Sequence, residues 1–170
     1  MKLDDAIITA LEYETGVHQL YFDAVNRTED PAAKKIFKVL CDEEKGHVDY
    51  LQHCLDEWRK TGRINAGELG TAIPTKQAIE KSLQELQQTV KPKPTHRPEL
   101  DLLQKALEAE IKTSNFYKEM VSTLDGEGQK LFKRFVEIEE GHEAIVQAEI
   151  NTVSNLGFWF DTPEFRLETE

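Results

Sequence analysis

The feature that most constrains the fold of this chain is an internal duplication. A Glu-x6-Tyr unit at residues 14–21 recurs 96 residues later, at 110–117. A Glu-x-Gly-His unit at residues 44–47 recurs 95 residues later, at 139–142. The two offsets differ by one residue, which a turn between the two units can absorb. The sequence therefore predicts one structural element written twice, each copy contributing half of a symmetric core.

The repeated segments have the periodicity of amphipathic helices. Side chains along residues 37–58 alternate in steps of three and four, the spacing that places them on one face of an α-helix. Residues 132–153 repeat this stripe, and residues 7–21 and 103–117 carry shorter versions of it. We therefore expect four long helices in two helical hairpins. Each of these stripes carries a carboxylate at a buried position: Glu14, Glu44, Glu110 and Glu139.

Helix-start signals fit this interpretation. Asp30 followed by Pro31 places an N-cap residue before a proline at the first helical position, and Asp125 followed by Gly126 is a weaker copy of it. Between the hairpins, residues 61–97 contain glycines at one end and prolines at the other, and an apolar stripe from Ile79 to Val90 predicts a short extra helix. A connection of this length can run back along helices that span roughly 42 Å.

These observations predict an all-α fold. We expect residues 1–156 to form a four-helix bundle with one long crossover at 61–97. Residues 157–170 group aromatic side chains around helix breakers, so we expect this tail to leave the last helix and lie against the bundle or a partner chain.

Charge and cysteine content exclude several classes of function. The net charge of −11 argues against nucleic acid and anionic membrane surfaces as partners. The sequence has neither an 18-residue apolar run nor a basic and apolar leader, so we expect a cytoplasmic protein. Cys41 and Cys54 would lie about 20 Å apart on one helix, too far for a disulfide. With no Cys-x-x-Cys pair, a thiolate-bound zinc or rubredoxin-type iron is excluded.

The duplicated units have the composition of a two-metal site. A Glu and a His three positions apart share one face of a helix and can bind the same ion. Four carboxylates balance two divalent ions, whereas unpaired they would cost several kcal/mol per buried charge. Oxygen and imidazole ligands without thiolate suit iron or manganese. The predicted metal ligands are Glu14, Glu44, His47, Glu110, Glu139 and His142.

With these motifs, most of residues 3–155 resembles the rubrerythrin branch of the ferritin-like di-iron carboxylate proteins. The resemblance implies that Glu44 and Glu139 bridge two iron ions, with manganese or a mixed pair as alternatives. It also implies that Glu14 and Glu110 are terminal ligands and that His47 and His142 each bind one ion. Tyr21 and Tyr117 would hydrogen-bond to ligand carboxylates, or they are core tyrosines with satisfied hydroxyl groups.

Two departures from the family pattern bear on mechanism. The cysteines of a rubredoxin domain are missing, so the electrons must come from another protein, such as one resembling rubredoxin. Family members often place a further Glu three residues after the ligand on the third helix, where this chain has Thr113. Among other candidates, His18 is a lining or surface residue near Glu14. Four further glutamates are expected on the solvated surface: Glu12, Glu43, Glu108 and Glu140.

The function predicted from the sequence is reduction of hydrogen peroxide by a di-iron oxidoreductase with an external electron donor, in a homodimer. Three alternatives stay open at this point. The first is a ferroxidase or iron-storage protein that uses O2. The others are an oxygenase acting on an organic substrate and a metal-binding protein without turnover.

Overall fold

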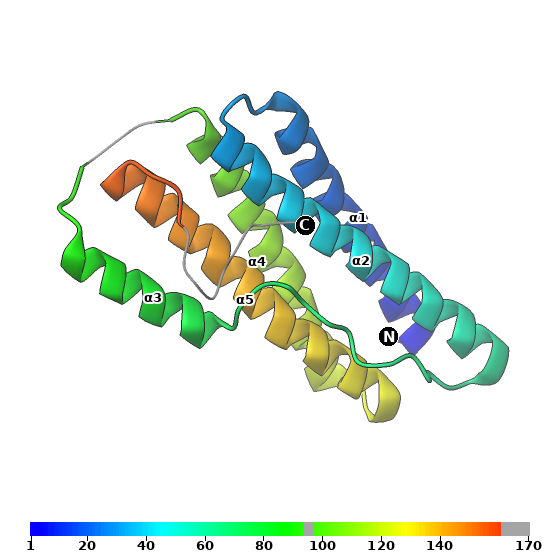
Figure 1. The fold of residues 1–170 in the computed structure, drawn as a ribbon. Helices are drawn as coiled ribbons and strands as arrows, with labels where there is room; N and C mark the ends of the chain where they lie inside the picture. Colours follow the sequence, from blue (N-terminus) through cyan, green and yellow to red (C-terminus); the bar gives the residue numbers. More distant parts are fainter. Residues whose placement is uncertain (94–96, 161–170) are drawn as a thin grey trace.

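The computed structural model describes residues 1–93 and 97–160 and contains five α-helices (Figure 1). The helices are α1 (Leu3–Arg27), α2 (Pro31–Thr61), α3 (Lys76–Thr89), α4 (Glu99–Thr123) and α5 (Gly126–Leu156). The described residues include no β-strand. The predicted all-α fold is confirmed, with four long helices and a short one in the connection between the second and third of them.

The long helices form two antiparallel pairs. Helix α1 packs along α2, α4 packs along α5, and α1 and α4 are also in contact. From the end of α2, the chain returns along the bundle to its middle, where α3 begins and continues beside α5 (Figure 1). A single crossover therefore passes over α5 near the middle of the bundle.

Local chemistry explains where these helices begin and end. The Asp30 carboxylate accepts hydrogen bonds from two backbone N–H groups in the first turn of α2, and Pro31 occupies the first helical position. Gly62 ends α2 with φ +69°, a left-handed conformation that glycine adopts without strain. Asp125 also precedes a helix, but its side chain makes no capping hydrogen bond. Asp125 therefore occupies the predicted N-cap position of α5 without acting as a hydrogen-bonding cap.

The buried apolar side chains form two clusters separated by a polar layer. One cluster contains, among others, Tyr21, Phe37, Leu40, Leu103 and Ile145. The other contains, among others, Ile7, Leu51, Tyr117, Phe132 and Phe135. Between them lie six of the buried polar side chains of the four long helices: Glu14, Glu44, His47, Glu110, Glu139 and His142. Buried charges are costly unless they are compensated, so this layer marks a functional region.

The start of the tail packs against the bundle. Gly157 ends α5 with φ +79°, and the ring of Trp159 contacts Phe37 edge-on at a centroid distance of 6.2 Å. Phe160 is fully buried, and its backbone N–H donates to the buried Glu149 carboxylate at 2.9 Å. The remainder of the predicted tail, residues 161–170, lies outside the described residues.

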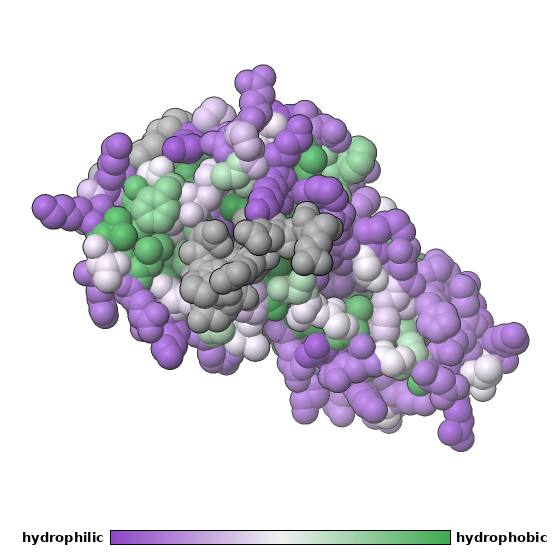
Figure 2. Space-filling view, in the orientation of Figure 1, coloured by the Kyte–Doolittle hydropathy of each residue, from purple (hydrophilic) through white to green (hydrophobic). Residues whose placement is uncertain are grey.

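The surface and the cysteines agree with the sequence-based picture. Cys41 and Cys54 are both free, as predicted. The face shown in Figure 2 is largely hydrophilic, with hydrophobic side chains gathered mainly toward the C-terminal ends of α3 and α5. Within residues 1–93 and 97–160, no helix has both the length and the apolar character needed to span a bilayer.

Candidate metal centre

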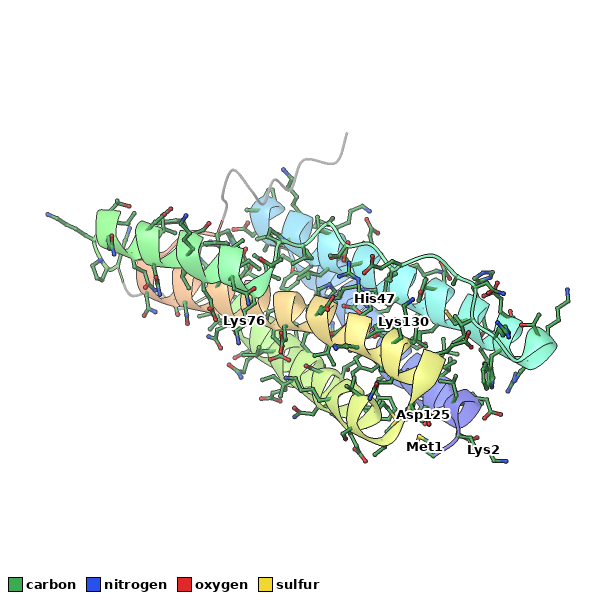
Figure 3. The ribbon with its side chains drawn as sticks, turned by 90° about the horizontal axis from the view of Figure 1, so that it is seen from below. Met1, Lys2, His47, Lys76, Asp125 and Lys130 are labelled. Atoms are coloured by element: carbon green, nitrogen blue, oxygen red, sulfur yellow. The ribbon has the colours of Figure 1, made fainter. Side chains whose placement is uncertain are left out.

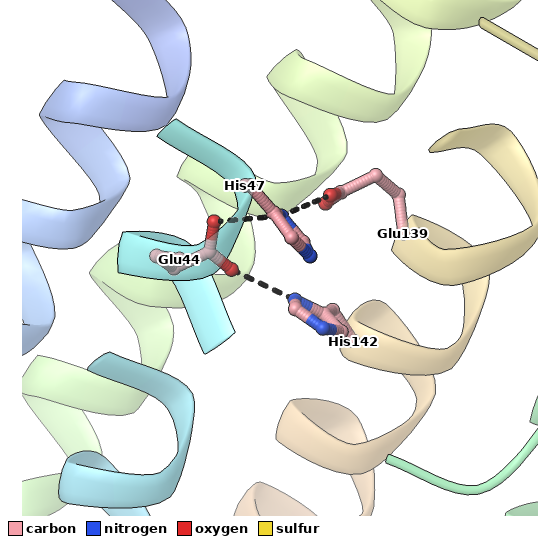
Figure 4. A group of neighbouring side chains, drawn as sticks. All are labelled: Glu44, His47, Glu139 and His142. Carbon is pink, nitrogen blue, oxygen red and sulfur yellow. Dashed lines mark hydrogen bonds and ion pairs between the residues drawn. The ribbon is translucent and has the colours of Figure 1, made fainter. Parts of the chain in front are cut away.

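Four side chains from two helices converge in the polar layer. Glu44 and His47 come from α2, and Glu139 and His142 come from α5 (Figure 4). All four are buried, and one candidate ligand atom from each lies within 4.8 Å of the others. Figure 3 shows His47 midway along the bundle, between α2 and α5. This group can hold a metal ion.

The two other predicted carboxylates complete the layer. Glu14 on α1 has its Oε2 atom 3.2 Å from His47 Nδ1, and Glu110 on α4 has its Oε1 atom 3.7 Å from His142 Nδ1. Each histidine therefore faces the first glutamate of its own hairpin. The structure brings all six predicted ligands together, although their binding of metal stays a prediction.

The two tyrosines of the repeated unit connect the hairpins reciprocally. The Tyr21 hydroxyl group on α1 donates to Glu110 Oε1 on α4. The Tyr117 hydroxyl group on α4 donates to Glu14 Oε1 on α1. Both tyrosines are fully buried. These hydrogen bonds orient the carboxylates: Glu14 keeps Oε2 toward His47, whereas Glu110 Oε1 both accepts from Tyr21 and lies toward His142.

Several buried carboxylate oxygens in this layer have no hydrogen-bond partner among the described residues. Such oxygens are available to bind a cation. Among the described residues, neither side-chain oxygen of Glu139 makes a hydrogen bond, and the same holds for Glu44 Oε2 and Glu110 Oε2. A buried polar atom without a partner costs about 1–3 kcal/mol. Carboxylate oxygens in this state, next to imidazole nitrogens, have the chemistry of a site for a hard or borderline metal ion.

The pKa values of the buried glutamates and of His47 are shifted by an excess of negative charge in this layer. Burial and the charges of Glu110 and Glu14 together raise the pKa of Glu44 to about 7, against the lowering effect of the histidines. Burial and the same two neighbours also raise the pKa of Glu139. Burial lowers the pKa of His47, but the carboxylates of Glu44 and Glu14 outweigh it and raise this pKa to about 10. Positive charge in this layer is therefore strongly favoured, whether protons or metal ions supply it.

One residue of this site was missed by the sequence-based prediction. Glu43 was expected on the solvated surface, but its side chain is only 12% exposed and its Oε2 atom lies 3.3 Å from His142 Nε2. It also accepts hydrogen bonds from the Thr71 hydroxyl group at 2.6 Å and from the Ala72 backbone N–H at 2.8 Å. Burial raises the pKa of Glu43, but the hydrogen bonds from these three partners lower it to about 2.

The duplication gives no sequence signal that would identify Glu43 as part of the site. Its counterpart at an offset of 95 residues is Ile138, so the repeat gives it no matching carboxylate. Two of its partners lie on the crossover, whose path along the bundle has no periodic pattern in the sequence.

The remaining candidates lie away from the layer or contribute no ligand atom. Thr113 is buried, and its hydroxyl group donates to the backbone oxygen of Ala109 at 2.9 Å. His18 packs beside Phe22 with a centroid distance of 6.3 Å and is not part of the cluster. Three glutamates are exposed to solvent to differing degrees, as expected: Glu12, Glu108 and Glu140.

No family model, curated protein or solved structure matches the chain. The fold and the site together define the class of protein: an all-helical bundle with a buried Glu and His group that can hold a metal ion.

Proposed function

We propose that this protein is a di-iron oxidoreductase of the rubrerythrin type, on a ferritin-like four-helix bundle, that reduces hydrogen peroxide with electrons from an external donor protein. The main support for this proposal is the buried carboxylate of Glu139. Both of its side-chain oxygens are fully buried and without hydrogen bonds among the described residues, beside Glu44 and two histidines. Two antiparallel helix pairs joined by one long crossover support the ferritin-like arrangement.

The positions of the carboxylates support a site for two ions. Glu44 Oε1 lies 2.8 Å from His142 Nδ1, while Glu44 Oε2 lies 3.3 Å from His47 Nδ1. Its two oxygens thus face different histidines, as expected of a carboxylate shared between two ions. Glu139 also reaches across the bundle, with Oε1 3.5 Å from His47 Nδ1. Glu14 with His47 would hold one ion, and Glu110 with His142 the other.

The protein would contribute charge, orientation and a dry environment. When bound, two ferrous ions supply the two electrons that, with two protons, convert one hydrogen peroxide into two waters. The tyrosine hydroxyl groups hold Glu14 and Glu110 in fixed orientations. The aromatic rings of Phe37 and Phe132 lie in the apolar clusters on either side of the layer and help exclude bulk water. Iron suits this ligand set, and manganese or a mixed pair would be bound by the same residues.

Rapid mixing tests the proposed reaction. The metal-free protein would be loaded anaerobically with two Fe(II) per chain and mixed separately with peroxide and with O2, while the absorbance of the oxidised site is followed. We expect oxidation by peroxide to be faster. Oxidation by O2 at an equal or greater rate would overturn the peroxidase assignment and favour a ferroxidase. A homodimer in solution fits the proposal, whereas a large cage would point to iron storage.

A further inference from the structure

We propose that Glu43 is a positioning residue for His142 and makes the two ion positions unequal, so that the position beside Glu110 and His142 fills first. This inference rests on the proposed metal centre and assigns to it a residue outside the six predicted ligands. It follows from the surroundings of the two histidines, which differ although the ligand types on the two hairpins are the same.

The two ring nitrogens of His142 face different groups. Its Nδ1 atom faces the carboxylate layer, 2.8 Å from Glu44 Oε1 and 3.7 Å from Glu110 Oε1. Its Nε2 atom faces away from the layer, toward Glu43 at 3.3 Å. When Nδ1 binds an ion, the neutral ring carries its proton on Nε2, and Glu43 is placed to accept that hydrogen bond. A carboxylate acceptor fixes the ring orientation and increases the basicity of the ligand nitrogen.

The position of Glu43 is itself fixed by the crossover. The Thr71 hydroxyl group and the Ala72 N–H bind its carboxylate, and the crossover backbone continues directly over α5. A Cβ atom placed on Gly141 would lie only 2.9 Å from the carbonyl oxygen of Pro74. The absence of a side chain at Gly141 therefore permits this close approach, which holds Thr71 and Ala72 beside Glu43.

Within residues 1–93 and 97–160, no carboxylate takes the equivalent place beside His47 Nε2. That atom is buried without a hydrogen-bond partner among the described residues. The residue that corresponds to Glu43 in the second copy is Ile138, which is buried and has no hydrogen-bonding side chain. The ring of Phe135 packs edge-on against His47 at a centroid distance of 5.5 Å. The Nε2 atom of His142 thus faces a carboxylate, whereas the Nε2 atom of His47 has no hydrogen-bond partner among the described residues.

Titration with Mn2+ tests the inequality. The free ion would be measured by its electron paramagnetic resonance signal as it is added to metal-free protein. We expect the wild-type chain to bind two ions in two resolved steps. Loss of such a histidine partner typically weakens metal binding about 10–100-fold, so Glu43→Gln should weaken the first step by that factor and leave the second nearly unchanged. Gln keeps the size and an acceptor oxygen for the crossover but removes the charge.

Glu140→Gln is the matched control. Glu140 is also adjacent to a predicted ligand, following Glu139 where Glu43 precedes Glu44, but its side chain is 40% exposed and lies 4.0 Å from Lys118. We expect this variant to titrate like the wild type. In the zinc-loaded protein, the nuclear magnetic resonance signal of the His142 ring N–H should move in Glu43→Gln, while that of His47 stays in place.

The outcomes separate this inference from the proposed function. If the wild type binds two ions and Glu43→Gln behaves like Glu140→Gln, the role of Glu43 is overturned while the metal centre stands. If Glu43→Gln weakens both Mn2+-binding steps equally and leaves the His142 ring N–H signal in place, Glu43 only holds the crossover in position. That result would also overturn the inference. A wild-type chain that binds no Mn2+, Zn2+ or Fe2+ would remove the metal centre itself.

Discussion

The two halves of the candidate metal centre have the same ligand types but different surroundings. On α5, the Glu-x-Gly-His unit lies under the crossover, and a Cβ atom at Gly141 would meet Pro74 O at 2.9 Å. On α2, Gly46 occupies the equivalent position and is exposed, and among the described residues no atom beyond its own helical turn lies within 4 Å of such a Cβ. A duplication supplies two equal motifs, but a single connection covers only one of them. The asymmetry of the site therefore has two sources, the exchange of Glu43 for Ile138 between the two copies and the crossover that binds Glu43.

The tyrosine contacts of the metal centre are the same in both hairpins. Tyr21 binds the carboxylate of Glu110, and Tyr117 binds that of Glu14, so each hairpin orients a glutamate of the other. These contacts lie entirely within the duplicated helices. Symmetry is thus retained where both partners recur in the two copies, and it is lost at Glu43, whose counterpart is Ile138 and two of whose partners lie on the crossover.

The largest effect is expected from Glu139→Gln, which removes a carboxylate that we propose both ions share. An ion at 100 times its Kd stabilises a fold by about 2.7 kcal/mol per site, and this variant should lose that gain for the ion pair. The stability of the metal-free protein should change little, because the raised pKa of Glu139 favours its neutral form, which Gln resembles. Thermal unfolding with and without Mn2+ measures both effects.

Glu140→Gln is the control for that change, since it alters an adjacent, partly exposed carboxylate. It should retain the full metal-dependent gain. A Glu139→Gln variant that still binds two ions per chain would contradict the assignment of Glu139 as a shared ligand.

A smaller and symmetric effect is expected from Tyr21→Phe and Tyr117→Phe. Each variant removes the hydroxyl donor of one buried carboxylate, and such a loss costs about 1–3 kcal/mol. Because the two contacts are reciprocal, the free energies of unfolding should fall by similar amounts in urea titrations of the metal-free protein. A neutral result for one variant alone would show that the halves also differ in this part of the site.

The smallest effects, of opposite sign, are expected from Gly46→Ala and Gly141→Ala. Alanine is favoured over glycine in a helix by about 0.5–1 kcal/mol, and Gly46 has open space for it, so this variant should be more stable. At Gly141 the added methyl group would press on the Pro74 carbonyl group and cost about 1–3 kcal/mol. Urea unfolding measures both. Equal shifts in the two variants would mean that the crossover does not cover α5 closely.

The sequence was informative wherever periodicity decides which side chains point inward. The steps of three and four residues placed Glu44, His47, Glu139 and His142 on buried stripes, and the structure brings these side chains together. The duplication added Glu14 and Glu110, and all six are buried in one layer. Helical geometry is local, so the facing of these residues follows from their spacing alone.

The tertiary structure alone decided the contacts that join the repeat to segments outside it. Glu43 meets Thr71 and Ala72, which lie 28 and 29 residues away in the sequence. Glu149, an inward position of α5, accepts a hydrogen bond from the backbone N–H of Phe160 in the tail. These partners lie on irregular segments, whose paths depend on packing over the whole bundle and have no repeating pattern to read. The sequence thus determined a symmetric set of candidate ligands and a carboxylate at position 43 without a counterpart in the second copy. The path of the crossover decided that this carboxylate is held beside His142.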